Sequence, residues 1–295
     1  MLNVYEQINH NKIRSGVIVS FFIAFIVGVS ILITNAYDLD NSLLIFALFL
    51  SLGSSFVSYF YGDKIVLSLN HARPATRQEF FDFYTVVENL SLVNQTPIPK
   101  IYVIDNDAPN AFASGRDPQH AIICATTGLL MKLNRTELEG VVAHELSHIK
   151  NYDILLMTIV SVLIGSLSIL INIAYRSTFF RRSNDRDNNQ ASGIIALLGF
   201  VLIIFAPLIA QLIQLAISRR REYFADASAV KLTRQPQGLI NALTKISQDN
   251  TVLDTASTAT ASLYITNPFK GNKIASLFST HPPVESRIKA LQDMM

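Results

Sequence analysis

Apolar residues are gathered into four long stretches that contain no charged side chain. These stretches are Ser15–Tyr37, Asn41–Gly62, Ile154–Tyr175 and Asn188–Ser218. A helix needs about 20 mainly apolar residues to cross a bilayer, and each stretch contains such a segment. The pattern therefore predicts four transmembrane helices, over residues 16–34, 42–61, 155–175 and 193–217, arranged as two hairpins. Four buried helices of a large soluble core are the alternative.

The apolar stretches divide the chain into four parts. We expect a transmembrane hairpin over 1–62, a soluble part over 63–153, a second hairpin over 154–218 and a second soluble part over 219–295. Lys12 and Arg14 precede the first stretch, Arg219–Arg221 follow the fourth, and the loop 35–41 has no basic residue. By the positive-inside rule, the N-terminus and both soluble parts face the cytoplasm.

One loop disagrees with this orientation. Four arginines lie between the third and fourth stretches, on the side that the rule assigns to the exterior: Arg176, Arg181, Arg182 and Arg186. The second hairpin therefore either crosses the membrane against the rule or does not cross it fully.

The soluble parts contain shorter helical and strand patterns. Apolar residues at helical spacing predict a helix over 76–92. Strands are expected over 100–103, 110–114 and 120–125, and the turn-rich residues between the last two predict a hairpin. Asn134 and Glu137 have the spacing of a capping box, which predicts that another helix begins there. The fold expected is mainly helical, with a small β-sheet.

Composition and charge narrow the possible functions. Charged residues make up only 16% of the chain, and the mean hydropathy is +0.33. The net charge is +2, and no basic tract with interleaved aromatic residues occurs, so we expect no nucleic-acid partner. Cys124 is the single cysteine and cannot form an intramolecular disulfide, so its apolar surroundings predict a buried strand residue.

The strongest chemical signal is the sequence His144-Glu-Leu-Ser-His148, in the helix that Asn134 begins. Histidines four residues apart share one helical face and can reach one metal ion, with Glu145 beside them as a general base. Two solvated histidines on a surface helix are the alternative. A catalytic zinc site needs a third protein ligand and an open position for water.

Glu222 is the candidate for the third ligand. It lies four residues before Asp226, directly after the fourth apolar stretch. Glu222 would complete a His2Glu site, and Asp226 would hold a ligating imidazole through its other ring nitrogen. The two acids could instead simply balance Arg219–Arg221. Two intervening spans return the chain to the membrane face of His144, which favours the ligand interpretation.

Taken together, these residues resemble the HtpX family of bacterial membrane zinc metalloproteases. The likeness covers essentially the whole chain and includes His144–Asp153, Glu222, Asp226, Ala72–Arg77, Pro109–Ala113, Thr136–Gly140, Ser279–Pro283 and Arg287. The resemblance implies a cytosolic α+β zincin domain of the gluzincin type that binds one Zn²⁺ per chain. It also implies a multi-pass protein of the bacterial cytoplasmic (inner) membrane that degrades misfolded or damaged membrane proteins during stress.

The resemblance also implies roles for individual residues. With zinc held by His144, His148 and Glu222, Glu145 would move a proton from water to the leaving amine. His281 would stabilise the oxyanion of the transition state. A further residue, Arg287, would pair with an acidic group of the site. The wider family includes the CAAX prenyl-protein proteases, so a CAAX-type protease is an alternative function, as is a non-proteolytic membrane scaffold.

The predicted hairpin suggests how a substrate is held. Proteases commonly bind a polypeptide as an added strand at a sheet edge, where backbone pairing tolerates many sequences. The candidate substrate-binding residues are Asn110, Ala111, Phe112 and Ala113, and the Asn110 side chain could also bind the substrate backbone. An ordinary internal strand is nearly as consistent with this sequence.

Overall fold

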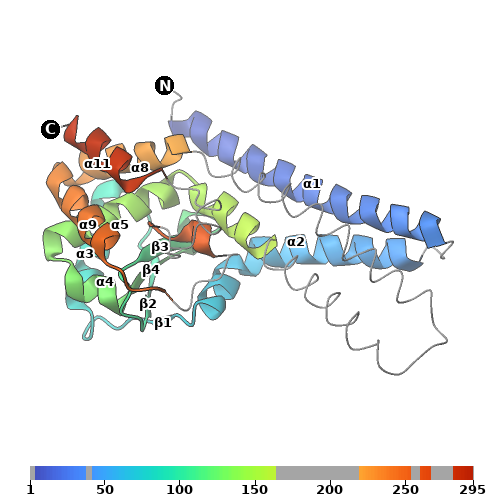
Figure 1. Ribbon diagram of the computed structural model, residues 1–295, viewed down its shortest axis with the longest axis horizontal. Coiled ribbons are helices and arrows are strands. Elements are labelled where there is room, and N and C mark those ends of the chain that lie inside the picture. Colours follow the sequence, from blue (N-terminus) through green and yellow to red (C-terminus); the bar gives the residue numbers. More distant parts are fainter. Residues whose placement is uncertain (1–3, 38–41, 164–218, 254–259, 267–281, 295) are drawn as a thin grey trace.

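The computed structural model describes residues 4–37, 42–163, 219–253, 260–266 and 282–294. Two long helices, α1 (Val4–Tyr37) and α2 (Ser42–Leu69), lie side by side and project from a body of shorter helices and one sheet (Figure 1). Among the described residues, one helical stretch, Asn9–Gly28 in α1, is long and apolar enough to cross a membrane.

The other predicted spans are described to different extents. The second, over 42–61, lies within α2 and is helical throughout. The apolar helix Asp153–Leu163 covers the beginning of the third, and the rest of it lies outside the described residues, as does the whole fourth span. The arrangement as two transmembrane hairpins therefore stays a prediction.

The body contains a mixed four-stranded sheet. Its strands are β1 (Arg73–Pro74), β2 (Lys100–Ile104), β3 (Ala111–Gly115) and β4 (Ala121–Thr126), in the order β1-β2-β4-β3. The predicted hairpin is confirmed, because β3 and β4 pair antiparallel; β2 joins β4 in parallel. Only β1 had no sequence signal, since two residues are too short to show alternation. As expected, Cys124 is buried, in β4.

Side chains of the hairpin alternate between two hydrophobic layers. Ala113 and Ile123 face a cluster formed with the helices on one side of the sheet, whereas Phe112 and Cys124 face a cluster that includes α2 and the helix Asp153–Leu163. Both faces of the hairpin are therefore covered. Because the side chains on both faces of β4 are buried, its sequence is an almost continuous run of apolar residues.

Within the described residues, the body contains six further helices. They are α3 (Phe81–Asn94), α4 (Thr127–Lys132), α5 (Arg135–Lys150), α8 (Arg219–Thr233), α9 (Pro236–Gln248) and α11 (Val284–Gln292). Single 3₁₀ turns occur at η1 (Pro118–His120) and η3 (Ala261–Leu263). The predicted start of α3 at residue 76 is wrong, because Arg73–Ala75 are hydrogen-bonded to β2 and the chain must turn before the helix begins.

Helix α5 occupies the centre of the body. The predicted capping box is confirmed: the Glu137 N–H donates to Asn134 Oδ1 over 3.0 Å, and the Asn134 N–H donates to Glu137 Oε2 over 2.9 Å. Beyond this start, α5 packs against α3, α8, α9 and β3 (Figure 1), and 12 of its 16 residues are buried. Side chains on α5 are therefore held by neighbours on every side.

Gly140 of α5 and Gly238 of α9 allow these two helices to cross at close range. A Cβ atom at Gly140 would lie 2.7 Å from the Leu239 backbone nitrogen. We therefore expect Gly140→Ala to lower the free energy of unfolding by about 1–3 kcal/mol, since neither backbone can yield easily. Thermal unfolding of the detergent-solubilised protein measures this loss. Gly16→Ala in α1 is the matched control: its Cβ would meet no atom within 4 Å, so its midpoint should be unchanged or higher. Equal midpoints for the two variants would contradict the prediction.

Candidate metal centre

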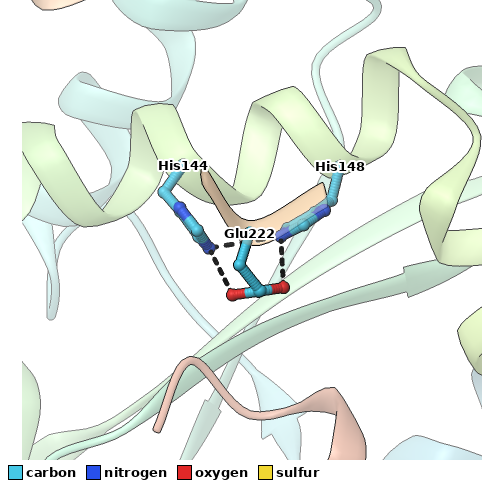
Figure 2. Close-up of side chains that lie close together, drawn as sticks. All are labelled: His144, His148 and Glu222. Atoms are coloured by element: carbon cyan, nitrogen blue, oxygen red, sulfur yellow. Dashed lines mark hydrogen bonds and ion pairs between the residues drawn. The ribbon is translucent and has the colours of Figure 1, made fainter. Parts of the chain in front are cut away.

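Three buried side chains, two from α5 and one from α8, point towards one another in the space between these helices and the sheet. His144 and His148 lie one turn apart on α5, and their Nε2 atoms are 3.2 Å apart. Glu222 of α8 faces both rings, with Oε2 3.6 Å from His144 Nε2 and Oε1 3.5 Å from His148 Nε2 (Figure 2). One ligand atom from each of the three residues lies within 4.8 Å of the other two.

The spacing of these atoms fits a tetrahedral metal ion. With zinc–nitrogen bonds of about 2.0–2.1 Å, two nitrogens on one tetrahedral ion are separated by about 3.3 Å. The observed separation is 3.2 Å between the two imidazole nitrogens. Two imidazoles and one carboxylate also form the donor set of many catalytic zinc sites. The residues therefore fit a bound zinc ion.

The charge around this point also favours a divalent cation. Four carboxylates are buried here, those of Glu145, Asp153, Glu222 and Asp226. The cationic side chains facing them are Arg287, beside Asp226, and Arg221, 3.5 Å from Asp153. When both imidazoles are neutral, as metal ligands must be, and all four carboxylates are ionised, two excess negative charges remain in a buried region, and a divalent ion would neutralise them.

Each histidine is held by an aspartate on its far side. His144 Nδ1 lies 2.9 Å from Asp226 Oδ1, and His148 Nδ1 lies 3.0 Å from Asp153 Oδ2. With a proton on each Nδ1, both Nε2 lone pairs face the same point, as metal binding requires.

Sequence reasoning did not assign Asp153 this role. Tyr152, directly before it, adopts a left-handed conformation with φ of 60°. This turn after α5 brings Asp153 back towards His148. The signal available in the sequence was the aspartate five residues after His148.

Arg287 of α11 connects the acidic groups. It is fully buried and donates to Asp226 through Nε over 2.9 Å and through an Nη over 2.7 Å. Its other Nη donates to the Ile265 carbonyl over 3.0 Å and lies 3.6 Å from Glu222. This bidentate pair of hydrogen bonds fixes the carboxylate of Asp226, and Asp226 in turn fixes the ring of His144. The acidic partner, which the sequence left open, is therefore Asp226.

Burial and nearby charges shift the pKa of Glu145, His144 and His148. Burial, reinforced by the charge of Glu222, raises the pKa of Glu145 to about 7. Burial and the Arg287 charge lower the pKa of His144 to about 4, which keeps this imidazole neutral. Burial also opposes the charged form of His148, but the Asp153 hydrogen bond and the nearby carboxylates outweigh it and raise its pKa to about 9. Glu145 therefore has a pKa suited to a general base near neutral pH.

Strand β3 passes directly beside Glu145. The Ala113 backbone lies near the Glu145 carboxylate and favours its ionised form. At Ala111 the outer edge of β3 is already in use, because the Ile265 N–H donates to the Ala111 carbonyl over 2.9 Å. The Asn110 amide donates to the Thr266 carbonyl over 3.1 Å. Among the strands that the structure describes, β3 lies at the edge of the sheet, as expected, and residues 265 and 266 cover part of that edge. The predicted site residue His281 lies outside the described residues.

Comparison with known proteins places the chain among peptidases. The sequence profile described as Peptidase family M48 matches residues 79–295. The chain is 42% identical over 291 residues to "Protease HtpX homolog" of Dictyoglomus turgidum, covering 98% of this chain and 94% of that protein. It is 43% identical over 296 residues to the protein of the same name from Ligilactobacillus salivarius, covering 99% and 100%.

A solved structure shares the fold. The crystal structure of S. mikatae Ste24p superposes with a TM-score of 0.52 and 22% sequence identity, and it covers 94% of this chain. The chain spans 65% of the length of Ste24p, slightly less than two thirds. At this identity the likeness concerns the fold alone.

Proposed function

The chain belongs to peptidase family M48, and we propose that it is a membrane-bound, zinc-dependent endopeptidase. The grouping of His144, His148 and Glu222, with Glu145 on the adjacent position of α5, carries this proposal. We propose these three residues as the zinc ligands, with one ion per chain. Asp226 and Asp153 would orient the two imidazoles, and Arg287 would hold Asp226 in place.

The chain's own residues would perform the proton transfers. A bound zinc ion lowers the pKa of water and polarises the carbonyl of a peptide bond. Glu145 would accept the proton of the attacking water and return it to the leaving amine. Its pKa of about 7 suits both steps, because the group is then neither a strong acid nor a strong base at neutral pH. His281 is proposed as a second group that stabilises the oxyanion.

The position of β3 supports a route for the substrate. We propose that an extended polypeptide binds along β3 near Ala113, whose backbone lies near the Glu145 carboxylate. Residues Asn110, Ala111 and Phe112 would continue this site once the segment around Ile265 gives way, since that segment hydrogen-bonds to Ala111. Backbone pairing of this kind is sequence-tolerant, which suits a peptidase that degrades misfolded or damaged membrane proteins.

Asn110→Ala tests this substrate site. In the structure the Asn110 amide donates to the Thr266 carbonyl, and once the segment around Thr266 gives way the amide would donate to the substrate backbone instead. Removing the amide removes this donor, so we expect KM for a polypeptide substrate to rise about 3- to 10-fold, as expected for one hydrogen bond. Zinc content should stay at the wild-type value. Steady-state kinetics of Asn110→Ala beside Asn89→Ala, an exposed asparagine of α3, measures the effect. Unchanged kinetics in Asn110→Ala would remove this residue from the proposed site.

The proposed membrane arrangement places the catalytic parts at the cytoplasmic face. Two transmembrane hairpins, over 1–62 and 154–218, would alternate with the catalytic parts 63–153 and 219–295. The apolar stretch Asn9–Gly28 and the basic residues Lys12 and Arg14 support the first hairpin and its orientation. The setting would be the bacterial cytoplasmic membrane.

Metal removal tests the proposed activity directly. The protein in detergent should cleave an unfolded polypeptide, and 1,10-phenanthroline should abolish this cleavage. Adding one equivalent of Zn²⁺ should restore it, because the proposed ligands His144, His148 and Glu222 form a single site. The isomer 1,7-phenanthroline, which cannot chelate, serves as the control. Cleavage that persists in protein shown by elemental analysis to contain no metal would contradict the proposal.

A further inference from the structure

Asn11 of α1 reaches from the first membrane helix into the base of the metal centre. Its side chain is 4% exposed, although it lies near the start of the candidate membrane span Asn9–Gly28. The amide Nδ2 donates to Asp153 Oδ1 over 2.7 Å and to the Asn151 carbonyl over 2.9 Å. Burying an amide is costly without such partners, and both partners follow the end of α5.

Asp153 is the residue at which three segments meet. Its Oδ2 faces His148 Nδ1 over 3.0 Å, while its Oδ1 receives the Asn11 amide. Arg221, at the start of α8, lies 3.5 Å from Oδ1, farther away than Asn11. A continuous path of buried contacts therefore runs from α1 through Asp153 to the imidazole of His148. Figure 1 shows the N-terminal end of α1 beside the body that contains α5 and α8.

The geometry makes Asn11 the closest donor to the outer oxygen of Asp153. A carboxylate with both oxygens occupied has a fixed plane, so His148 Nδ1 meets a fixed acceptor. Without the amide, the nearest partner of Oδ1 among the described residues is the Arg221 guanidinium, and the carboxylate can rotate towards that charge. Such a rotation would loosen the His148 ring, whose Nε2 faces the other proposed ligands.

We propose that Asn11 is a positioning residue of the metal centre, through which the first membrane helix controls the affinity of the site for zinc. The proposal rests on the proposed zinc site. Groups that orient a ligating histidine change metal affinity by about 10- to 100-fold, and Asn11 acts one contact farther out, so about 10-fold is expected. Displacement of α1 in the membrane would then weaken metal binding without altering any ligand.

Zinc affinity of the full-length protein in detergent tests the proposal. Asn11→Ala should raise the Kd for Zn²⁺, measured by competition with a chromophoric chelator, about 10-fold. Asn11→Leu, which fills a similar volume with no donor, should raise it as well and provides a second variant if alanine impairs folding. Visible absorption of the Co²⁺-substituted protein should shift in both, because this spectrum reports ligand geometry. Ser15→Ala is the matched control, since Ser15 is buried on α1 and donates to the Asn11 carbonyl of its own helix.

A double-mutant cycle separates positioning from a general effect on stability. In an Asp153→Ala background, Asn11→Ala should cause no further rise in the Kd for Zn²⁺, because the path through Asp153 is already broken. A wild-type Kd in both Asn11 variants would overturn the proposal. So would an undiminished effect of Asn11→Ala in the Asp153→Ala background, which would indicate that the two residues act independently. Failure of the zinc site itself is recognised separately, by wild-type protein that binds no Zn²⁺.

Discussion

Glu145→Gln is expected to lower peptide-bond hydrolysis by about 10²- to 10⁴-fold while zinc stays bound. The glutamine side chain has the size of glutamate but cannot accept the proton of the attacking water. The amide oxygen of glutamine can take the place of a carboxylate oxygen beside the Ala113 backbone. The variant should therefore fold and bind metal like the wild type.

Single-turnover rates and zinc content, measured on the same detergent preparations, check this expectation. Glu139→Gln is the matched control, because it makes the same chemical change on α5 at a side chain 37% exposed. This control should keep both the rate and the metal. Retained activity in Glu145→Gln would exclude Glu145 as the general base, whereas loss of zinc together with activity would leave its role as a base without support.

Glu222→Gln is expected to have the second large effect, the loss of tight zinc binding. The carboxylate supplies the only negative charge among the three proposed ligands, His144 and His148 being neutral imidazoles when they bind a metal. The substitution also removes a negative charge 3.6 Å from the buried guanidinium of Arg287. Because a neutral amide binds Zn²⁺ more weakly than a carboxylate, activity should fall with metal occupancy.

The measurement is the Kd for Zn²⁺ together with the rate at saturating Zn²⁺. Excess Zn²⁺ should restore part of the activity in Glu222→Gln but none in Glu145→Gln, which distinguishes a ligand from a base. Glu285→Gln, at an exposed position at the start of α11, is the control and should behave as wild type. Wild-type affinity in Glu222→Gln would remove this residue from the ligand set.

Local spacing was enough to predict the helix that carries the proposed ligands. An α-helix repeats every 3.6 residues, so His144 and His148 had to share a face wherever α5 was placed. The capping box at Asn134 and Glu137 specifies where that helix begins through contacts three residues apart. The hairpin of β3 and β4 was similarly readable, because its turn and strands are contiguous in the chain.

Contacts between distant segments required the tertiary structure. The sequence suggested that Arg287 pairs with an acid, but several carboxylates were available, and only the packing of α11 against α8 selects Asp226. The hydrogen bond from Ile265 to Ala111, at the edge of β3, likewise joins residues more than a hundred positions apart. No local sequence pattern predicts a contact between residues so far apart.

By itself, the sequence determined the chemistry of this protein: a helix with two histidines on one face and a glutamate beside them, and a second helix, after an apolar stretch, with two acidic residues four positions apart. The tertiary structure decided which groups surround that chemistry, including Asp153 behind His148 and Asn11 behind Asp153. The physical reason is that hydrogen bonds within a helix depend on a fixed local repeat, whereas buried polar groups must find partners wherever packing brings them.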